Sequence, residues 1–183
     1  MPPPIDLEAA FLGPLVAGRT CGDCTICCTV LRIDTAELDK PAGTPCVHTN
    51  GLGCAIHATR PQLCRAWFCG WRRMATMPAA ARPDRSGLLV SLDYEKSPRN
   101  CLEGVAIVVR SLTGRAAFEG RLAEDLLDAL CGQLVPVWLH DGAQKVLVHP
   151  DGEIAAFIFS GEPPPADLRD EVAAWRSRYA MFG

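Results

Sequence analysis

Cysteine is the residue type in this chain whose number and spacing indicate chemistry. There are ten cysteines among 183 residues, and eight of them fall between positions 21 and 69. The first four form the pattern C-x2-C-x2-C-C, and the complete set is Cys21, Cys24, Cys27, Cys28, Cys46, Cys54, Cys64 and Cys69. Two-residue gaps let a tight turn direct two sulfurs at one ion while the intervening amides donate hydrogen bonds to those sulfurs. The spacing therefore predicts a metal site with these eight cysteines as its ligands.

The cellular compartment decides whether such thiols bind metal or form disulfides. The chain begins Met1-Pro2-Pro3-Pro4 and has no lysine or arginine before Arg19, so the basic start of a secretory signal is missing. We therefore expect a cytoplasmic protein, where a dense cysteine cluster is more typical of metal binding, with a secreted disulfide fold as the alternative. No apolar run approaches the roughly 18 to 20 residues needed to cross a bilayer, so we expect no membrane partner.

The later cysteines belong to the motif R-P-x2-C-R-x3-C, which runs from Arg60 to Cys69. Together with C-x2-C-x2-C-C and the two spaced cysteines between them, this pattern resembles the YkgJ-like cysteine-cluster family, described as zinc- or iron-chelating. The resemblance covers residues 21–69 and includes all eight cysteines, and it implies metal chelation without specifying an activity. Many members have C-x-I-Y where this chain has Cys54-Ala55-Ile56-His57. His57 is then an extra ligand, a hydrogen-bond donor to sulfur, or a tolerated substitution, and we favour the last.

The identity of the metal follows less directly from the spacing. C-x2-C-x2-C is the run that bacterial ferredoxins use for three corners of a [4Fe–4S] cluster, with the fourth cysteine far along the chain. Four thiolates of any origin also satisfy zinc. We therefore favour an iron–sulfur cluster over zinc, which stays the alternative. Neighbouring Cys27 and Cys28 serve two centres, or one of them is structural. Our hypothesis assigns one centre to Cys21, Cys24, Cys27 and Cys64, and leaves Cys28, Cys46, Cys54 and Cys69 as the remaining ligands.

Arginines and aromatic residues alternate in the same region. Six arginines and one acid lie between Arg60 and Arg85, and positive charge there stabilises thiolates and anionic clusters. Interleaved aromatic and basic residues are also typical of surfaces that stack nucleic-acid bases. The formal net charge of -3 argues against a nucleic-acid specialist. We therefore expect Trp67, Phe68 and Trp71 to shield the metal from water, and the arginines to face solvent.

The chain divides into three parts by composition. Residues 1–18 are a lead-in with a short helix from Ile5 to Leu12, and residues 19–77 are the cysteine-rich metal-binding module. That module has little hydrophobic periodicity, so metal–ligand bonds are expected to supply its folding energy. A linker or connecting loop around residues 77–83 leads to the small α+β half, residues 78–183.

The third part has ordinary globular patterning. Five apolar runs are predicted as strands: Leu88 to Leu92, Val105 to Val109, Val135 to Leu139, Val146 to Val148 and Ile154 to Phe159. Turn residues between the last three predict an antiparallel meander. Leucines 122, 126, 127 and 130 predict a helix that stops at Gly132, and a last helix, with apolar residues from Leu168 to Phe182, is expected to cover the sheet. The fold class is α+β, an irregular cysteine-rich module packed on a small antiparallel sheet with flanking helices.

The remaining reactive residue types have simpler interpretations. Cys101 and Cys131 lie outside the cluster and are expected to be buried small hydrophobes. Asp141 and Asp151 flank turns, where a backbone role is typical. We therefore interpret the chain as a metal-binding protein of unresolved metal role. The alternatives are a metal-dependent modification or redox enzyme, with a pocket bordered by His57, Arg60 and Arg65, and a reversible metal carrier; whether the chain is an enzyme, and which protein it binds, stay open.

Overall fold

The computed structural model describes residues 7–180. The strands are β1 (Ile33–Asp34), β2 (Asp39–Lys40), β3 (Leu88–Tyr94), β4 (Val105–Ser111), β5 (Val137–His140) and β6 (Lys145–His149). The α-helices are α1 (Leu7–Leu12), α2 (Ile26–Val30), α3 (Gln62–Ala66), α4 (Gly70–Arg73), α5 (Pro83–Ser86), α6 (Cys101–Gly104), α7 (Arg121–Cys131), α8 (Gly152–Ser160) and α9 (Arg169–Ala180). Short 3-10 turns are η1 (His57–Thr59), η2 (Ala79–Ala81) and η3 (Arg115–Phe118). Within this range, no helix has both the length and the apolar character that a bilayer crossing requires.

The main sheet has the strand order β3-β4-β5-β6 within the described residues. β3 pairs with β4 and β5 with β6 in antiparallel fashion, whereas β4 and β5 run parallel. A parallel pair needs a long crossover, and α7 supplies it. The expected α+β class is confirmed, but the prediction of a wholly antiparallel sheet is wrong at the β4–β5 pair.

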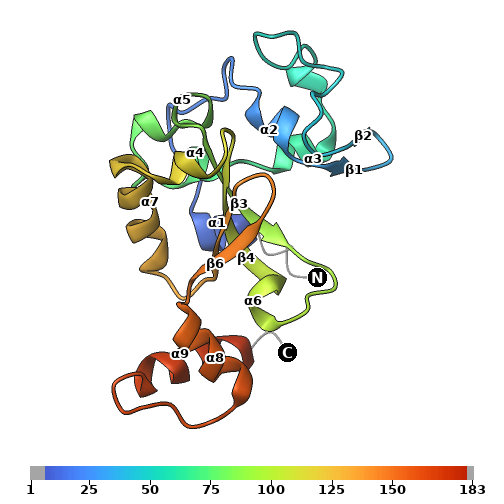
Figure 1. Cartoon of the computed structure of the whole chain (residues 1–183). Helices are drawn as coiled ribbons and strands as arrows, with labels where there is room; N and C mark the ends of the chain where they lie inside the picture. The colour runs from blue at the N-terminus through green and yellow to red at the C-terminus, as the bar shows by residue number, and fades with distance from the viewer. Residues whose placement is uncertain (1–6, 181–183) are drawn as a thin grey trace.

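One face of the sheet carries the larger hydrophobic core. Alternate strand residues such as Val90, Ile107 and Val137 point to this face and are almost fully buried. Helices α1, α4 and α7 contribute to the same core through Leu12, Trp71 and Leu130, among others. Figure 1 shows these helices beside the sheet. The predicted helix with its stop at Gly132 is confirmed as α7, and α1 occupies most of the expected N-terminal helix.

The apolar run from Ile154 to Phe159 is a helix, so the prediction of a fifth strand there is wrong. Asp151 caps this helix, α8, because its side chain accepts hydrogen bonds from the amides of Glu153 and Ile154 at 2.9 and 3.0 Å. A short continuous apolar run does not distinguish a buried strand from a buried helix, and here the cap decides for the helix. Asp141 also has the expected backbone role, accepting hydrogen bonds from two amides of its turn.

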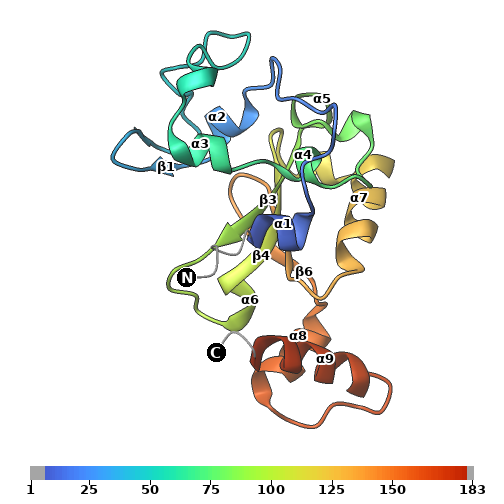
Figure 2. The same cartoon turned by 180° about the vertical axis from the view of Figure 1, so that it is seen from behind.

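The last helix packs chiefly on α8 rather than covering the sheet. Trp175 and Val172 of α9 are fully buried in a second hydrophobic cluster with Ile154 of α8, and Trp138 of β5 packs against it. Figures 1 and 2 show the α8–α9 pair at the end of the molecule opposite the cysteine-rich segment. Phe182, which was expected to join this surface, lies outside the described residues.

The cysteine-rich segment has almost no hydrophobic core of its own. Between residues 19 and 69, Ile33 and Cys46 are the two hydrophobic side chains that are buried. Lys40 is also buried, and its Nζ donates hydrogen bonds to the carbonyls of Thr29, Pro41 and Thr44 at 2.9 to 3.1 Å. A segment of this length does not gain enough free energy from such limited apolar burial to offset its chain entropy.

The connection between the two halves is packed rather than free. Met77 and Ala81 are buried in the main core, and η2 lies between the two halves. The stretch predicted as a linker or connecting loop is therefore fixed to the main core by its apolar residues.

Close packing between α4 and β3 leaves no room for a side chain at Gly70. A Cβ atom at Gly70 would lie 2.7 Å from Cγ1 of Val90, well inside van der Waals contact. We expect Gly70→Ala to lower the free energy of unfolding by about 1–3 kcal/mol through overpacking. Denaturant unfolding measures this, and adding Val90→Ala should recover part of the loss. Gly152→Ala is the matched control, because a Cβ there meets no atom within 4 Å; an equal loss at Gly152 would contradict the overpacking argument.

Candidate metal centre

All eight predicted cysteines line a single cavity of about 150 Å³. Its walls are otherwise mainly apolar and include Leu31, Ile56, Trp67, Phe68 and Leu89. Leu89 belongs to β3, so the main sheet forms part of the wall. Protein interiors contain few voids larger than a water molecule, and a cavity of this size surrounded by thiols is therefore the outstanding chemical feature of the molecule.

Four of the cysteines are electrostatic neighbours of one another, and one of them packs against the core beside the sheet. Burial raises the pKa of Cys69 to about 11, and the nearby thiolates of Cys21 and Cys24 raise it as well. The hydrogen bond with Cys28 and burial are the main causes of the raised pKa of Cys27, and Cys28, Cys21 and Cys69 add smaller electrostatic contributions. Cys69 also packs against the main hydrophobic core. We call these four the inner group: Cys21, Cys24, Cys27 and Cys69.

The other four cysteines lie together in the loops farther from the sheet. Burial raises the pKa of Cys64, and the neighbouring thiolates of Cys28, Cys46 and Cys54 raise it further. The amide of Cys46 donates a 2.9 Å hydrogen bond to the carbonyl of Cys28, which holds two of these residues side by side. We call these four the outer group: Cys28, Cys46, Cys54 and Cys64.

The two groups meet at the peptide bond between Cys27 and Cys28 at the start of α2. Consecutive helical residues point about 100° apart, so the two side chains diverge toward different neighbours. Their sulfurs are 4.0 Å apart and share a hydrogen bond. This contact raises the pKa of Cys27 and lowers the pKa of Cys28, whose thiolate form is also stabilised by Lys40 and Arg60.

These neighbour sets differ from the ligand sets expected from the sequence, and the division of the ligands stays a prediction. Cys69, not Cys64, is the neighbour of Cys21, Cys24 and Cys27, and Cys64 lies with Cys28 instead. The two residues are separated by the end of α3 and the extended stretch that follows it. That geometry carries the chain from the loops to the sheet between positions 64 and 69, and spacing alone does not show it.

Two arginines that the motif analysis did not single out hold the inner group in place. Arg19 donates hydrogen bonds to the carbonyls of Trp71, Met74 and Met77 at 2.5 to 2.9 Å, and its guanidinium lies over the Trp71 ring. This joins the chain just before Cys21 to the chain just after Cys69. The acceptors are backbone carbonyls, which leave no mark in the sequence.

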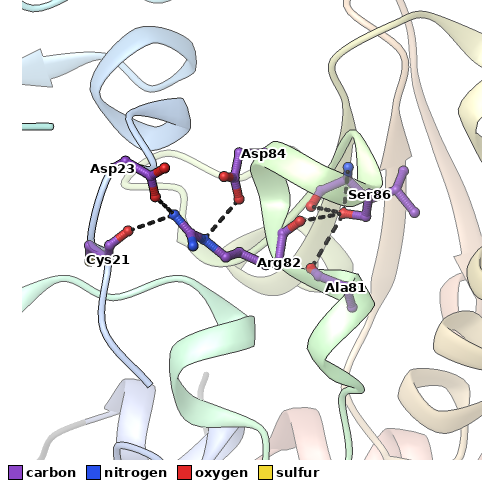
Figure 3. A network of polar contacts seen from close by, with 7 residues as sticks. Cys21, Asp23, Ala81, Arg82, Asp84 and Ser86 are labelled. Carbon is purple, nitrogen blue, oxygen red and sulfur yellow. Dashed lines mark hydrogen bonds and ion pairs between the residues drawn. The ribbon is translucent and has the colours of Figure 1, made fainter. Parts of the chain in front are cut away.

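Arg82 fixes the Cys21–Cys24 loop from the other side (Figure 3). Its guanidinium donates to the Cys21 carbonyl at 3.1 Å and forms ion pairs with Asp23 and Asp84. The hydrogen bond from Arg82 is the main reason that the pKa of Asp23 is lowered. The backbone of Asp84 also acts on Cys24, where it lowers the pKa of the thiol and partly offsets the effect of burial. The α5 segment therefore both positions this loop and interacts with one of its sulfurs.

Close backbone approach joins the Cys21–Cys24 loop to the Cys46–Cys54 loop. Gly53 has a φ of +134°, and a Cβ atom there would lie 2.9 Å from the Gly22 carbonyl oxygen. Only glycine suits both the conformation and the contact. The two glycines therefore let an inner-group loop and an outer-group loop share one cavity.

The structure places the aromatic residues at the cavity, where shielding of a metal stays a prediction, and it places the arginines only partly as expected. Trp67, Phe68 and Trp71 line the cavity rather than an open surface. Arg65 is exposed, but Arg73 is only 5% exposed, pairs with Glu8 at 3.2 Å, and lies over the Phe68 ring. The expectation that these arginines all face solvent is therefore wrong at Arg73, which is a buried structural cation.

The enzyme alternative predicts a pocket bordered by three residues, and the structure places two of them at the cavity. His57 and Arg60 line the cavity, but Arg65 does not. Arg60 contacts the His57 ring at Nε2 and donates to the carbonyl of Cys64 at 2.8 Å, so it braces the outer group. His48 also lines the cavity.

The ten cysteines are free thiols in this structure, and the two outside the cluster occupy helix ends. Cys131 is partly buried at the end of α7, whereas Cys101 at the start of α6 is exposed. The expectation of a buried small hydrophobe is thus wrong for Cys101, because the first residue of this short helix faces solvent.

The cysteines are the kind of ligand that a thiophilic metal prefers, but their side chains do not surround a common metal position in this structure. Eight thiols with Lys40, Arg60 and Arg82 nearby supply soft ligands and compensating positive charge. Among residues 7–180, however, no three His, Cys, Asp or Glu side chains stand in a geometry that could hold a metal ion. Binding a metal ion therefore requires the thiols to move closer together than they lie in this structure.

Comparison with known proteins adds no identity to this geometry. No protein-family model, curated protein or solved structure matches the chain.

Proposed function

We propose that this protein binds a thiophilic metal through its cysteine cluster, as an iron–sulfur cluster or as zinc. The observation that carries the proposal is the gathering of eight thiols around one cavity, in a segment that buries only two hydrophobic side chains. Thiolate–metal bonds contribute folding free energy directly and so supply what this segment lacks.

The kind of metal follows from the ligands. Thiolates select zinc, copper(I) and iron–sulfur clusters over hard cations such as magnesium and calcium. Backbone N–H groups of Ile26 and Asp84 lower the pKa of Cys24, and those of Trp71 and Arg72 lower the pKa of Cys69, which favours the thiolate form that cluster and zinc sites use. The cysteine pattern also supports placing the chain with the YkgJ-like cysteine-cluster family, and we retain that as part of the proposal.

Metal and acid-labile sulfide analysis tests the proposal on protein purified without oxygen. Stoichiometric iron and sulfide with thiolate-to-iron absorption in the visible would support a cluster, and stoichiometric zinc in colourless protein would support the alternative. Cys101→Ser is the control and should leave the metal content unchanged, because Cys101 lies on α6, away from the cavity lining. Protein that contains neither metal, and binds neither on reconstitution, would overturn the proposal.

Arg82 should set the affinity of the inner group without being a ligand. We expect Arg82→Gln to weaken zinc or cobalt(II) binding by about 10- to 100-fold, the usual effect of removing a residue that orients metal ligands. Competition with a chromophoric chelator measures the affinity. Arg85→Gln removes the same charge from an exposed neighbour and is the matched control. If Arg85→Gln weakened metal binding as much as Arg82→Gln, the effect would come from lost charge alone, and the positioning role of Arg82 would be contradicted.

A further inference from the structure

We infer that the inner and outer groups form two separate centres, each holding its own metal ion or cluster with four thiolates. This inference rests on the proposed metal-binding function and adds the number of centres and the ligands of each. It differs from a single shared site, and also from the division in which Cys64 completes the set of Cys21, Cys24 and Cys27.

The first support is the way the backbone sorts the sulfurs. Cys27 and Cys28 lie on successive helical positions, so a single centre cannot easily take both. The amide-to-carbonyl bond between Cys46 and Cys28 ties Cys28 to the loops, whereas Cys69 is tied to the core beside the sheet. The divergence at α2 therefore assigns one of the adjacent thiols to each group.

The second support is that each group has its own source of positive charge. Arg82 lies at the inner group, with its guanidinium on the Cys21 carbonyl and close to Cys24. Lys40 and Arg60 lie at the outer group: Lys40 donates to the carbonyl of Thr29, next to Cys28, and Arg60 donates to the Cys64 carbonyl at 2.8 Å. A four-thiolate zinc or iron–sulfur centre carries net negative charge, and separate cations for the two groups match two such anionic sites.

The third support is the unequal anchoring of the two groups. Cys69 precedes α4, which packs on β3 through Gly70, and the Cys21–Cys24 loop is clamped by Arg19 and Arg82. The outer group sits in loops that have Ile33 and Cys46 as their buried apolar residues. The two groups thus have different structural supports: the inner one from the sheet and the Arg19 and Arg82 contacts, and the outer one from loop contacts.

Cobalt(II) titration of the apo protein, followed by native mass spectrometry, counts the centres. We expect two cobalt ions per chain, each with the absorption of a four-thiolate site. Cys21→Ser/Cys69→Ser and Cys54→Ser/Cys64→Ser should each bind one ion, because each pair removes ligands from one group. Cys64→Ser/Cys69→Ser takes one ligand from each group and should weaken both sites. Cys101→Ser should keep two ions.

Thiol alkylation at one equivalent of zinc tests the same division without any mutation. Cysteines protected by the first zinc ion should be either the inner four or the outer four. Saturation of the wild-type protein at one ion, or protection of Cys64 together with Cys21, Cys24 and Cys27, would overturn the two-centre division while leaving metal binding intact. A wild-type protein that binds no cobalt or zinc would overturn the proposed function and this inference together.

Discussion

Removing the metal with a chelator is expected to unfold residues 19–69 while the main sheet stays folded. The segment buries Ile33 and Cys46 as its hydrophobic side chains, whereas β3, β4 and β5 share a continuous core with α7. Structural zinc contributes on the order of 10–16 kcal/mol in small metal-binding domains, which is more than the remaining contacts of such a segment provide.

Hydrogen exchange followed by mass spectrometry measures this expected result. Peptides from residues 19–69 should lose their protection after chelation, while peptides from residues 88–111 and 121–140 keep theirs. Addition of zinc or of iron with sulfide should restore the protection. Unchanged exchange in residues 19–69 after complete metal loss would show that the metal does not hold this segment, and simultaneous loss throughout the chain would show that the two halves do not unfold separately.

Arg73→Ala is expected to destabilise the protein by about 3–5 kcal/mol, the usual cost of leaving one member of a buried ion pair without the other. Arg73 is 5% exposed and Glu8 is 13% exposed, with 3.2 Å between Nη2 and Oε2. Arg73 also donates to the Gly13 carbonyl at 3.2 Å, so it joins α1 and the turn that follows it to α4. Denaturant unfolding of metal-loaded protein measures the loss.

Two controls separate the buried pair from a general charge effect. Arg32→Ala removes an arginine from a surface pair with Asp34, whose side chains are 60% and 73% exposed, and should change stability by no more than about 1 kcal/mol. The double variant Glu8→Met/Arg73→Met should be much less destabilised than Arg73→Ala, because no buried charge is left alone. A double variant as unstable as Arg73→Ala would contradict this account.

Local signals in the sequence were sufficient for the elements that they specify directly. The leucine spacing of α7, its stop at Gly132, and the continuous apolar runs of β3 and β4 are local features, and those elements form where expected. The strand prediction for Ile154 to Phe159 fails because these residues suit a strand or a helix equally, and the Asp151 cap favours the helix. The antiparallel prediction fails at the β4–β5 pair, which is parallel, because the pairing direction depends on the path of the α7 crossover, and the turn residues do not encode that path.

The sequence by itself determined which side chains are the candidate ligands, because ligand type and C-x2-C spacing are local properties of the chain. The tertiary structure alone decided how they are grouped. Cys64 and Cys69 are five positions apart and line the same cavity, yet they have different neighbouring cysteines. Arg19 and Arg82 position the inner group through backbone carbonyls far along the chain. Such acceptors are present at every residue, so only the folded chain shows which of them are used.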